Sequence, residues 1–266
     1  MARATRCSPE HRADTNDAYQ AAVLRAIAHM KLHLAVPLDL SQLAGVANMS
    51  KFHFVRVFDE ITGTTPHHFL SCLRVQRAKE ILLHTAASIT DVCLEVGYNS
   101  LGTFSTTFSE LVGVSPQQFR LLPKRLTAAQ FAMTIWRYLA ARKKISGPTI
   151  EGIVEGPRTP KGFVFVGTFA SGVPLGVPVS GTVMLGCGKF CIERPAAPEF
   201  HLLAALVPLS ASLAEMSVNI PISLVASLRL HHLPDPQPKP LLRLRPLLLT
   251  DPPIVMALPS LPPLRG

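Results

Sequence analysis

Phe52 and Arg56 lie four positions apart in a segment whose apolar residues repeat at helical spacing. At 100° per residue, Phe54 and Phe58 fall on one face of the expected helix. Phe52 and Arg56 fall on the opposite face, with Val55 at its edge. An arginine guanidinium can donate to O6 and N7 of guanine, and a phenylalanine or valine can contact a thymine methyl. The outward pair predicts a surface that reads base edges; the alternative is a solvated arginine beside a phenylalanine folded back onto a neighbouring helix.

The segment that holds these residues is written twice, at an offset of fifty positions. Each copy predicts a short helix, a tight turn and a second amphipathic helix ended by glycine, which is the layout of a helix-turn-helix. Two such units in one chain suggest a protein that reads DNA without dimerising. The recurring residues are Val46 and Val96, Ser50 and Ser100, Phe54 and Phe104, Phe58 and Phe108, Glu60 and Glu110, Gly63 and Gly113, Pro66 and Pro116, and Phe69 and Phe119.

The two recognition helices are expected at about Lys51–Thr62 and Ser100–Val112. A long helix from Pro66 to about His84 joins the copies, and an earlier helix is expected at about Asp17–Leu34.

Three further expectations concern single side chains. Ser50 is expected to cap the first recognition helix through its hydroxyl, and Ser88 with Asp91 is similar to a capping box. On the joining helix, Arg77 and Lys79 are expected on a solvated face.

The second recognition helix offers different chemistry from the first. Gly102 and Thr106 stand where the first copy has Phe52 and Arg56, and neither is charged. We therefore expect less base specificity from this half, with phosphate contacts as its main contribution. The candidate DNA-binding residues are Lys51, Phe52, Val55 and Arg56 in the first helix and Ser100, Gly102, Thr103 and Thr106 in the second.

The charge distribution favours a polyanionic partner for the duplicated unit. The formal net charge is +9, and the first 145 residues hold 17 Lys and Arg against 10 Asp and Glu. The remaining residues hold 9 against 7, so the positive excess lies with the repeat. Five scattered cysteines do not form a disulfide framework, and the apolar stretches are too short to span a bilayer. We expect no signal peptide, no contact with a membrane and a cytoplasmic location.

The composition changes at about Ser146, beyond which 19 of the 24 prolines lie. Short β-branched and aromatic runs separated by Gly and Pro predict a small β-sandwich. The expected strands are Phe163–Phe169, Val177–Leu185, Gly188–Ile192, His201–Val207, Leu241–Leu249 and Ile254–Leu258. Cys187, Cys191 and His201 form only a weak candidate metal set, and two buried strand thiols are the favoured interpretation. We expect no bound metal, no cofactor and no catalytic residue.

The repeat resembles the DNA-binding unit of AraC/XylS-type bacterial transcription regulators over about Ala21–Leu121. The residues that carry the resemblance are Gly97-Tyr98-Asn99-Ser100, Phe104, Phe108, Gly113, Ser115-Pro116, Phe119-Arg120, the stretch Ala47–Phe58 and the run Leu73–Ala78. The resemblance implies seven helices, with two helix-turn-helix subdomains that a rigid helix joins and that read adjacent major-groove segments. Many members carry a basic residue near Thr106 or Thr107, which this sequence lacks. The usual order of domains in the family is also reversed here.

These observations predict a mainly α N-terminal domain (tandem helix-turn-helix, seven helices) plus a C-terminal all-β sandwich-like domain. The expected boundaries are a disordered tail at 1–16, the DNA-binding domain at 17–122, a helix or linker at 123–151, and a β-rich effector or interaction domain at 152–264.

The expected function is that of a sequence-specific transcription regulator, named here as an activator, that acts on nucleoid DNA. Its candidate partners are double-stranded DNA, RNA polymerase and a small-molecule effector at the C-terminal domain. Two alternatives stay open. One is a DNA-anchored enzyme such as an alkyl-acceptor repair protein that uses Cys187 or Cys191. The other is a protein-interaction module on a DNA-binding domain.

Overall fold

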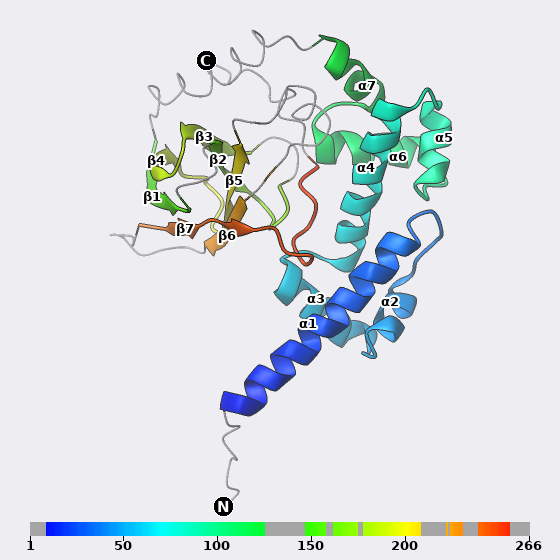
Figure 1. Cartoon of the computed structure of the whole chain (residues 1–266), viewed down its shortest axis with the longest axis horizontal. Helices are drawn as coiled ribbons and strands as arrows, with labels where there is room; N and C mark the ends of the chain where they lie inside the picture. The colour runs from blue at the N-terminus through cyan, green and yellow to red at the C-terminus, as the bar shows by residue number, and fades with distance from the viewer. Residues whose placement is uncertain are drawn as a thin grey trace, which may run out of the picture.

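The helices come first along the chain and the strands follow, as Figure 1 shows. The computed structural model describes residues 9–125, 147–157, 162–174, 178–208, 222, 224–230 and 239–255. The helices are α1 (Pro9–Leu32), α2 (Leu40–Val46), α3 (Lys51–Thr62), α4 (Pro66–His84), α5 (Ile89–Glu95), α6 (Leu101–Val112) and α7 (Pro116–Arg125). The strands are β1 (Thr149–Glu155), β2 (Gly162–Phe169), β3 (Ser180–Leu185), β4 (Gly188–Glu193), β5 (Phe200–Pro208), β6 (Leu224–Leu230), β7 (Leu241–Arg243) and β8 (Arg245–Pro246).

Seven helices and two sheets in the described residues confirm the expected fold class. The first helix differs from the expectation, because α1 begins at Pro9 instead of Asp17. Residues 9–16, which the sequence placed in a disordered tail, are therefore helical. Most of the expected linker at 123–151 lies outside the described residues, and β1 begins within its last residues.

The duplication holds in three dimensions, with one correction to its register. The recognition helices α3 and α6 are related by fifty positions, but α2 and α5 are related by forty-nine. The turns agree with this shift, since Met49 N–H donates to Ala44 O and Tyr98 N–H donates to Cys93 O. The second turn therefore holds one extra residue. Val96 does not correspond to Val46, contrary to the sequence comparison.

The helix caps follow the sequence in most places. Ser88 and Asp91 form the expected capping box on α5, and Gly63 and Gly113 end the two recognition helices at φ 72° and 92°. Only glycine adopts such left-handed backbone at low cost. Ser50 occupies the N-cap position of α3, but its side chain makes no cap hydrogen bond, so its expected role was wrong.

Each helix-turn-helix packs on its own aromatic core. In the first half, Phe54 and Phe58 of α3 pack against Phe69 of α4, with ring centroids 5.5 Å apart in each adjacent pair. These three rings are at most 1% exposed, whereas Phe52 is 93% exposed. The predicted inward and outward faces of α3 are confirmed.

The strands form a three-stranded sheet in the order β4-β1-β7 and a five-stranded sheet in the order β3-β2-β5-β6-β8. Apolar side chains of both sheets meet in one core, which includes Ile150 and Phe190 from the small sheet and Val166 and Ala204 from the large one. Strands β1 and β6 had no sequence prediction. The expected strand at 241–249 is two short strands, and the expected strand at 254–258 lies mostly outside the described residues.

The sheets are joined to the helical part through two valines. Val173 and Val255 are fully buried in the core that α4 to α7 build. Lys79 on α4 is 2% exposed, and its Nζ donates to Val255 O at 3.1 Å. The segment that reaches Val255 runs from the sheets towards α4 (Figure 1). The expectation that Lys79 lies on a solvated face was therefore wrong, because the second domain covers that face.

Replacing Phe54 by Ala should lower the free energy of unfolding by about 3–5 kcal/mol, since it empties a packed aromatic site. Replacing Phe52 by Ala should change it by less than about 0.5 kcal/mol, since that ring packs on almost nothing. Urea unfolding followed by far-ultraviolet circular dichroism measures both. Equal losses in the two variants would contradict the assigned faces.

Burial lowers the pKa of Lys79 from an ordinary value of 10.5 to about 8. Between these pH values the unfolded chain binds more protons than the folded chain, so this lysine makes stability rise with pH. The stability of the natural protein relative to Lys79→Met should therefore increase from pH 8 to pH 10.5, by up to about 3 kcal/mol. Lys189→Met, at an exposed lysine, is the control and should give no such trend. A flat difference for Lys79→Met in denaturant unfolding would contradict the burial.

Candidate nucleic-acid interface

The first recognition helix presents the predicted residues on one outward face. Lys51, Phe52 and Arg56 are exposed, and Val55 is half-buried beside them. The inward face is fixed by buried Phe54, so the helix cannot rotate without exposing an aromatic ring. This face combines two cations with an apolar surface that protein does not cover.

His53 is a residue that the sequence reasoning missed. Its Nδ1 lies 3.3 Å from Arg56 Nη2, which donates to it when the ring proton is on Nε2. The same ring packs edge-on against Tyr19 of α1 at 5.2 Å between centroids. His53 therefore restrains the guanidinium from the side of the helix, and α1 restrains His53. The spacing of three residues between His53 and Arg56 is the signal that could have indicated the contact.

The second recognition helix presents small uncharged side chains. Ser100, Gly102, Thr103 and Thr106 are all exposed. The Ser100 hydroxyl accepts from the Thr103 N–H at 3.4 Å and caps the helix. A Cβ at Gly102 would meet only Ser100 Oγ at 3.7 Å, so this helix end is open to close approach. The arrangement suits contacts to phosphate and to base methyl groups more than bidentate readout.

Arg74 on α4 holds the two halves in a fixed relation. Its Nε and Nη2 donate to Leu34 O and Val36 O at 3.0 Å each, in the turn that follows α1 of the first half. Its guanidinium carbon lies 5.5 Å from the ring centroid of Tyr98, in the turn of the second half. Gly97, with φ 85°, is required beside it, because a Cβ there would lie 2.3 Å from Leu34 O. The side chain therefore joins three segments that are distant in sequence.

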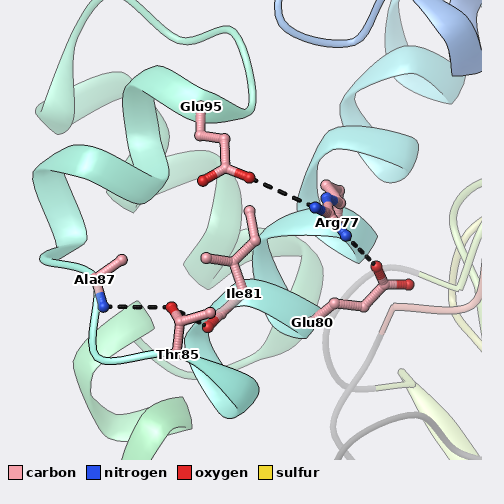
Figure 2. A network of polar contacts seen from close by, with 6 residues as sticks. All are labelled: Arg77, Glu80, Ile81, Thr85, Ala87 and Glu95. Carbon is pink, nitrogen blue, oxygen red and sulfur yellow. Dashed lines mark hydrogen bonds and ion pairs between the residues drawn. The ribbon is translucent and has the colours of Figure 1, made fainter.

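A second polar network lies at the far end of α4 and is shown in Figure 2. Arg77 pairs with Glu80 at 3.1 Å and with Glu95 of α5 at 3.5 Å, and all three side chains are about half exposed. Thr85 Oγ1 donates to Ile81 O and accepts from the Ala87 N–H. Exposed ion pairs of this kind contribute little stability. Arg77 is on a solvated face, as expected.

The described residues hold no group of three metal-ligating side chains. Cys187 is exposed and Cys191 is half-buried, so the interpretation as two buried thiols was wrong. Partial burial of the sulfur raises the pKa of the Cys187 thiol, which lowers its thiolate fraction. None of the described helices is both long enough and apolar enough to cross a membrane.

Residues 43–121 match the protein-family model described as "Helix-turn-helix domain". With the two glycine-ended recognition helices and their aromatic cores, the match defines this part of the chain as a tandem helix-turn-helix domain. The domain is of the AraC type, as the sequence resemblance indicated.

Two curated relatives share this part of the chain. The MmsAB operon regulatory protein of Pseudomonas aeruginosa is 42% identical over 94 residues, which are 35% of this chain and 30% of that protein. An uncharacterized HTH-type transcriptional regulator of Staphylococcus aureus (strain COL) is 35% identical over 92 residues, which are 35% of this chain and 12% of that protein. The chain thus spans less than a third of the length of either relative.

Two solved structures also resemble it. The DNA-binding domain of AdpA in complex with a target DNA is 28% identical and covers 39% of this chain and 95% of its own, at a TM-score of 0.37. An AraC-type transcriptional regulator from Chromobacterium violaceum is 26% identical and covers 41% and 96%, at a TM-score of 0.39.

Arg74→Met should destabilise the protein by roughly 2 kcal/mol, since two charge-assisted hydrogen bonds to backbone carbonyls are lost. Arg77→Met removes the same charge from an exposed position of the same helix and should cost less than about 0.5 kcal/mol. Denaturant unfolding of both variants tests the role of Arg74. Equal costs would show that Arg74 does not join the two halves.

Proposed function

We propose that this chain is a sequence-specific DNA-binding transcription regulator of bacterial nucleoid DNA. The observation that carries the proposal is the pair of recognition helices, each ended by a glycine, of which the first exposes Phe52 and Arg56 over a buried aromatic core. An exposed phenylalanine beside a restrained arginine suits a thymine methyl next to a guanine. The AraC type of the domain supports the same assignment.

The spacing of the two halves supports binding to adjacent major-groove segments. The first helix-turn-helix packs around the start of α4 and the second around its end. Nineteen helical residues extend over about 28 Å, which is comparable with the ~34 Å of one turn of B-DNA. Because Arg74 fixes the two halves, we propose that they dock as one body.

The two recognition helices are proposed to make different contacts with DNA. Lys51, Ser100 and Thr103 lie at or near helix N-termini, where phosphate contacts set register. Phe52, Val55 and Arg56 select bases in one groove, while Gly102 and Thr106 allow close approach in the other. We propose no catalytic role for the chain. Its C-terminal domain is proposed to carry regulation, through an effector or through RNA polymerase.

Selection of bound sites from random duplex DNA, with the full chain, tests the proposal. We expect one enriched site with two base groups about one helical turn apart, of which one is the more strongly specified. Affinity for it should fall steeply with salt. Failure to enrich any sequence, with binding at low salt equally weak for all duplexes, would refute sequence-specific recognition.

Arg56→Ala should cost roughly 1–3 kcal/mol on the selected site and relax the preference at one position, since a bidentate contact to guanine is lost. Arg77→Ala makes the same change of charge on α4 and should leave the base preference intact. Titration of the selected duplex and of single-base variants measures both effects. Unchanged selectivity in Arg56→Ala would remove this residue from the reading face.

A further inference from the structure

A cavity of about 820 Å³ lies between the five-stranded sheet and the C-terminal end of α3. Residues 59–65 form one wall, and Leu247, Asp251, Pro252 and Ile254 form another. Cavities of this volume are typical of sites for drug-sized organic molecules.

The floor of the cavity is the sheet face that points away from the two-sheet core. Phe165 pairs with Val183 on one side and Ala205 on the other, and Ala205 pairs with Val225. Side chains of directly paired residues lie on the same face, so these four make one apolar row across β3, β2, β5 and β6. Phe165 and Ala205 are only half-buried. An outward sheet face is usually polar, so an apolar row that is incompletely covered indicates a ligand surface.

The charged groups around the cavity leave an excess of carboxylates. Arg245 is held by Asp251 through two bonds of 2.6 and 2.7 Å, and Arg229 is paired with Glu199. Both arginines are thereby neutralised by their own acids. Asp59 and Glu60 also line the cavity, are exposed, and have no ion-pair partner among the residues that the structure describes.

We propose that this cavity binds an organic cation with a bulky apolar body, and that such a molecule is the effector of the regulator. The apolar row receives the body, and the carboxylates of Asp59 and Glu60 receive the positive charge. The effector role rests on the proposed function, whereas binding at the cavity does not.

The position of the cavity connects a ligand directly to the recognition helix. Asp59 and Glu60 are in the last turn of α3, one turn beyond Arg56. The sheet side touches the same region, since a Cβ at Gly172 would lie 2.7 Å from Gly63 O. A bound ligand therefore contacts both the proposed DNA-reading helix α3 and the five-stranded sheet beside it. Occupancy of the cavity and binding of DNA are then linked, and the linkage is reciprocal.

Tetraphenylphosphonium is the probe, and tetraphenylborate is its control, with nearly the same shape and the opposite charge. Isothermal titration of the full chain should detect binding of the cation. Ala205→Phe and Ser227→Phe fill the cavity from the floor and should each weaken binding at least about tenfold. Leu185→Phe changes an exposed residue of β3 outside the cavity and should leave the affinity within about twofold. Glu60→Gln should weaken the cation severalfold without a change of volume.

Cation binding that is insensitive to both filling variants would overturn the site. Binding of tetraphenylborate that is abolished by Ala205→Phe would overturn the assigned charge of the ligand. Ser227 is exposed, so Ser227→Phe keeps the test valid if the other variant does not fold.

For the effector role, the affinity for the selected duplex is measured with and without saturating probe. The probe should change the affinity for the duplex by the same factor by which the duplex changes the affinity for the probe. In Ala205→Phe the probe should leave the affinity for the duplex unchanged. Probe binding without any coupling would overturn the effector role. A chain that binds the probe but selects no DNA would instead refute the proposed function and leave the site standing.

Discussion

Edge-on and tilted contacts between phenylalanines determine how each recognition helix is oriented. The two trios are Phe54, Phe58 and Phe69 in the first half and Phe104, Phe108 and Phe119 in the second, with adjacent centroids 5.5–5.7 Å apart. Two rings of each trio belong to the recognition helix and one to the helix that follows, so the recognition helix is fixed to that helix. Such contacts add about 0.5–1.5 kcal/mol each to the burial of apolar area. The outward faces of α3 and α6 follow from these contacts, because a helix with one face fixed has its other face fixed as well.

The recognition helices α3 and α6 have the same aromatic inner face and differ on their outer faces. The first half has Phe52 and Arg56 on its outer face, together with His53, which restrains the arginine. The second has Gly102 and Thr106 at the matching positions and one extra residue in its turn. The extra residue accommodates Tyr98, whose ring lies beneath the guanidinium of Arg74. The two halves therefore differ in role: the proposed base readout lies in the first, and Tyr98 attaches the second to Arg74 of α4.

Sequence reasoning succeeded where periodicity and chain-local chemistry decide the structure. The recognition helices, their glycine ends and the inward phenylalanines all follow from local spacing. Reasoning failed where a distant segment decides. Lys79 has the neighbours of a surface lysine in sequence, and only the arrival of Val255 buries it. Strand β1 pairs with β4 and with β7, which lie far along the chain, and nothing in its own composition indicates these partners. The candidate DNA-binding residues other than half-buried Val55 were predictable as exposed positions, whereas the contact of His53 depends on Tyr19 of another helix.

Val173 and Val255 have a consequence for how this protein can be divided. Both are fully buried among side chains of α4 to α7, so the second half completes its core with material from the other domain. A fragment cut after α7 would keep all seven helices of the described residues and yet expose to water the two apolar sites that Val173 and Val255 fill. Such a fragment would not reproduce the packing of the intact protein. A fusion of the helical unit to an unrelated protein would leave the same two apolar sites unfilled. The change in composition at Ser146 therefore does not separate two independently packed cores.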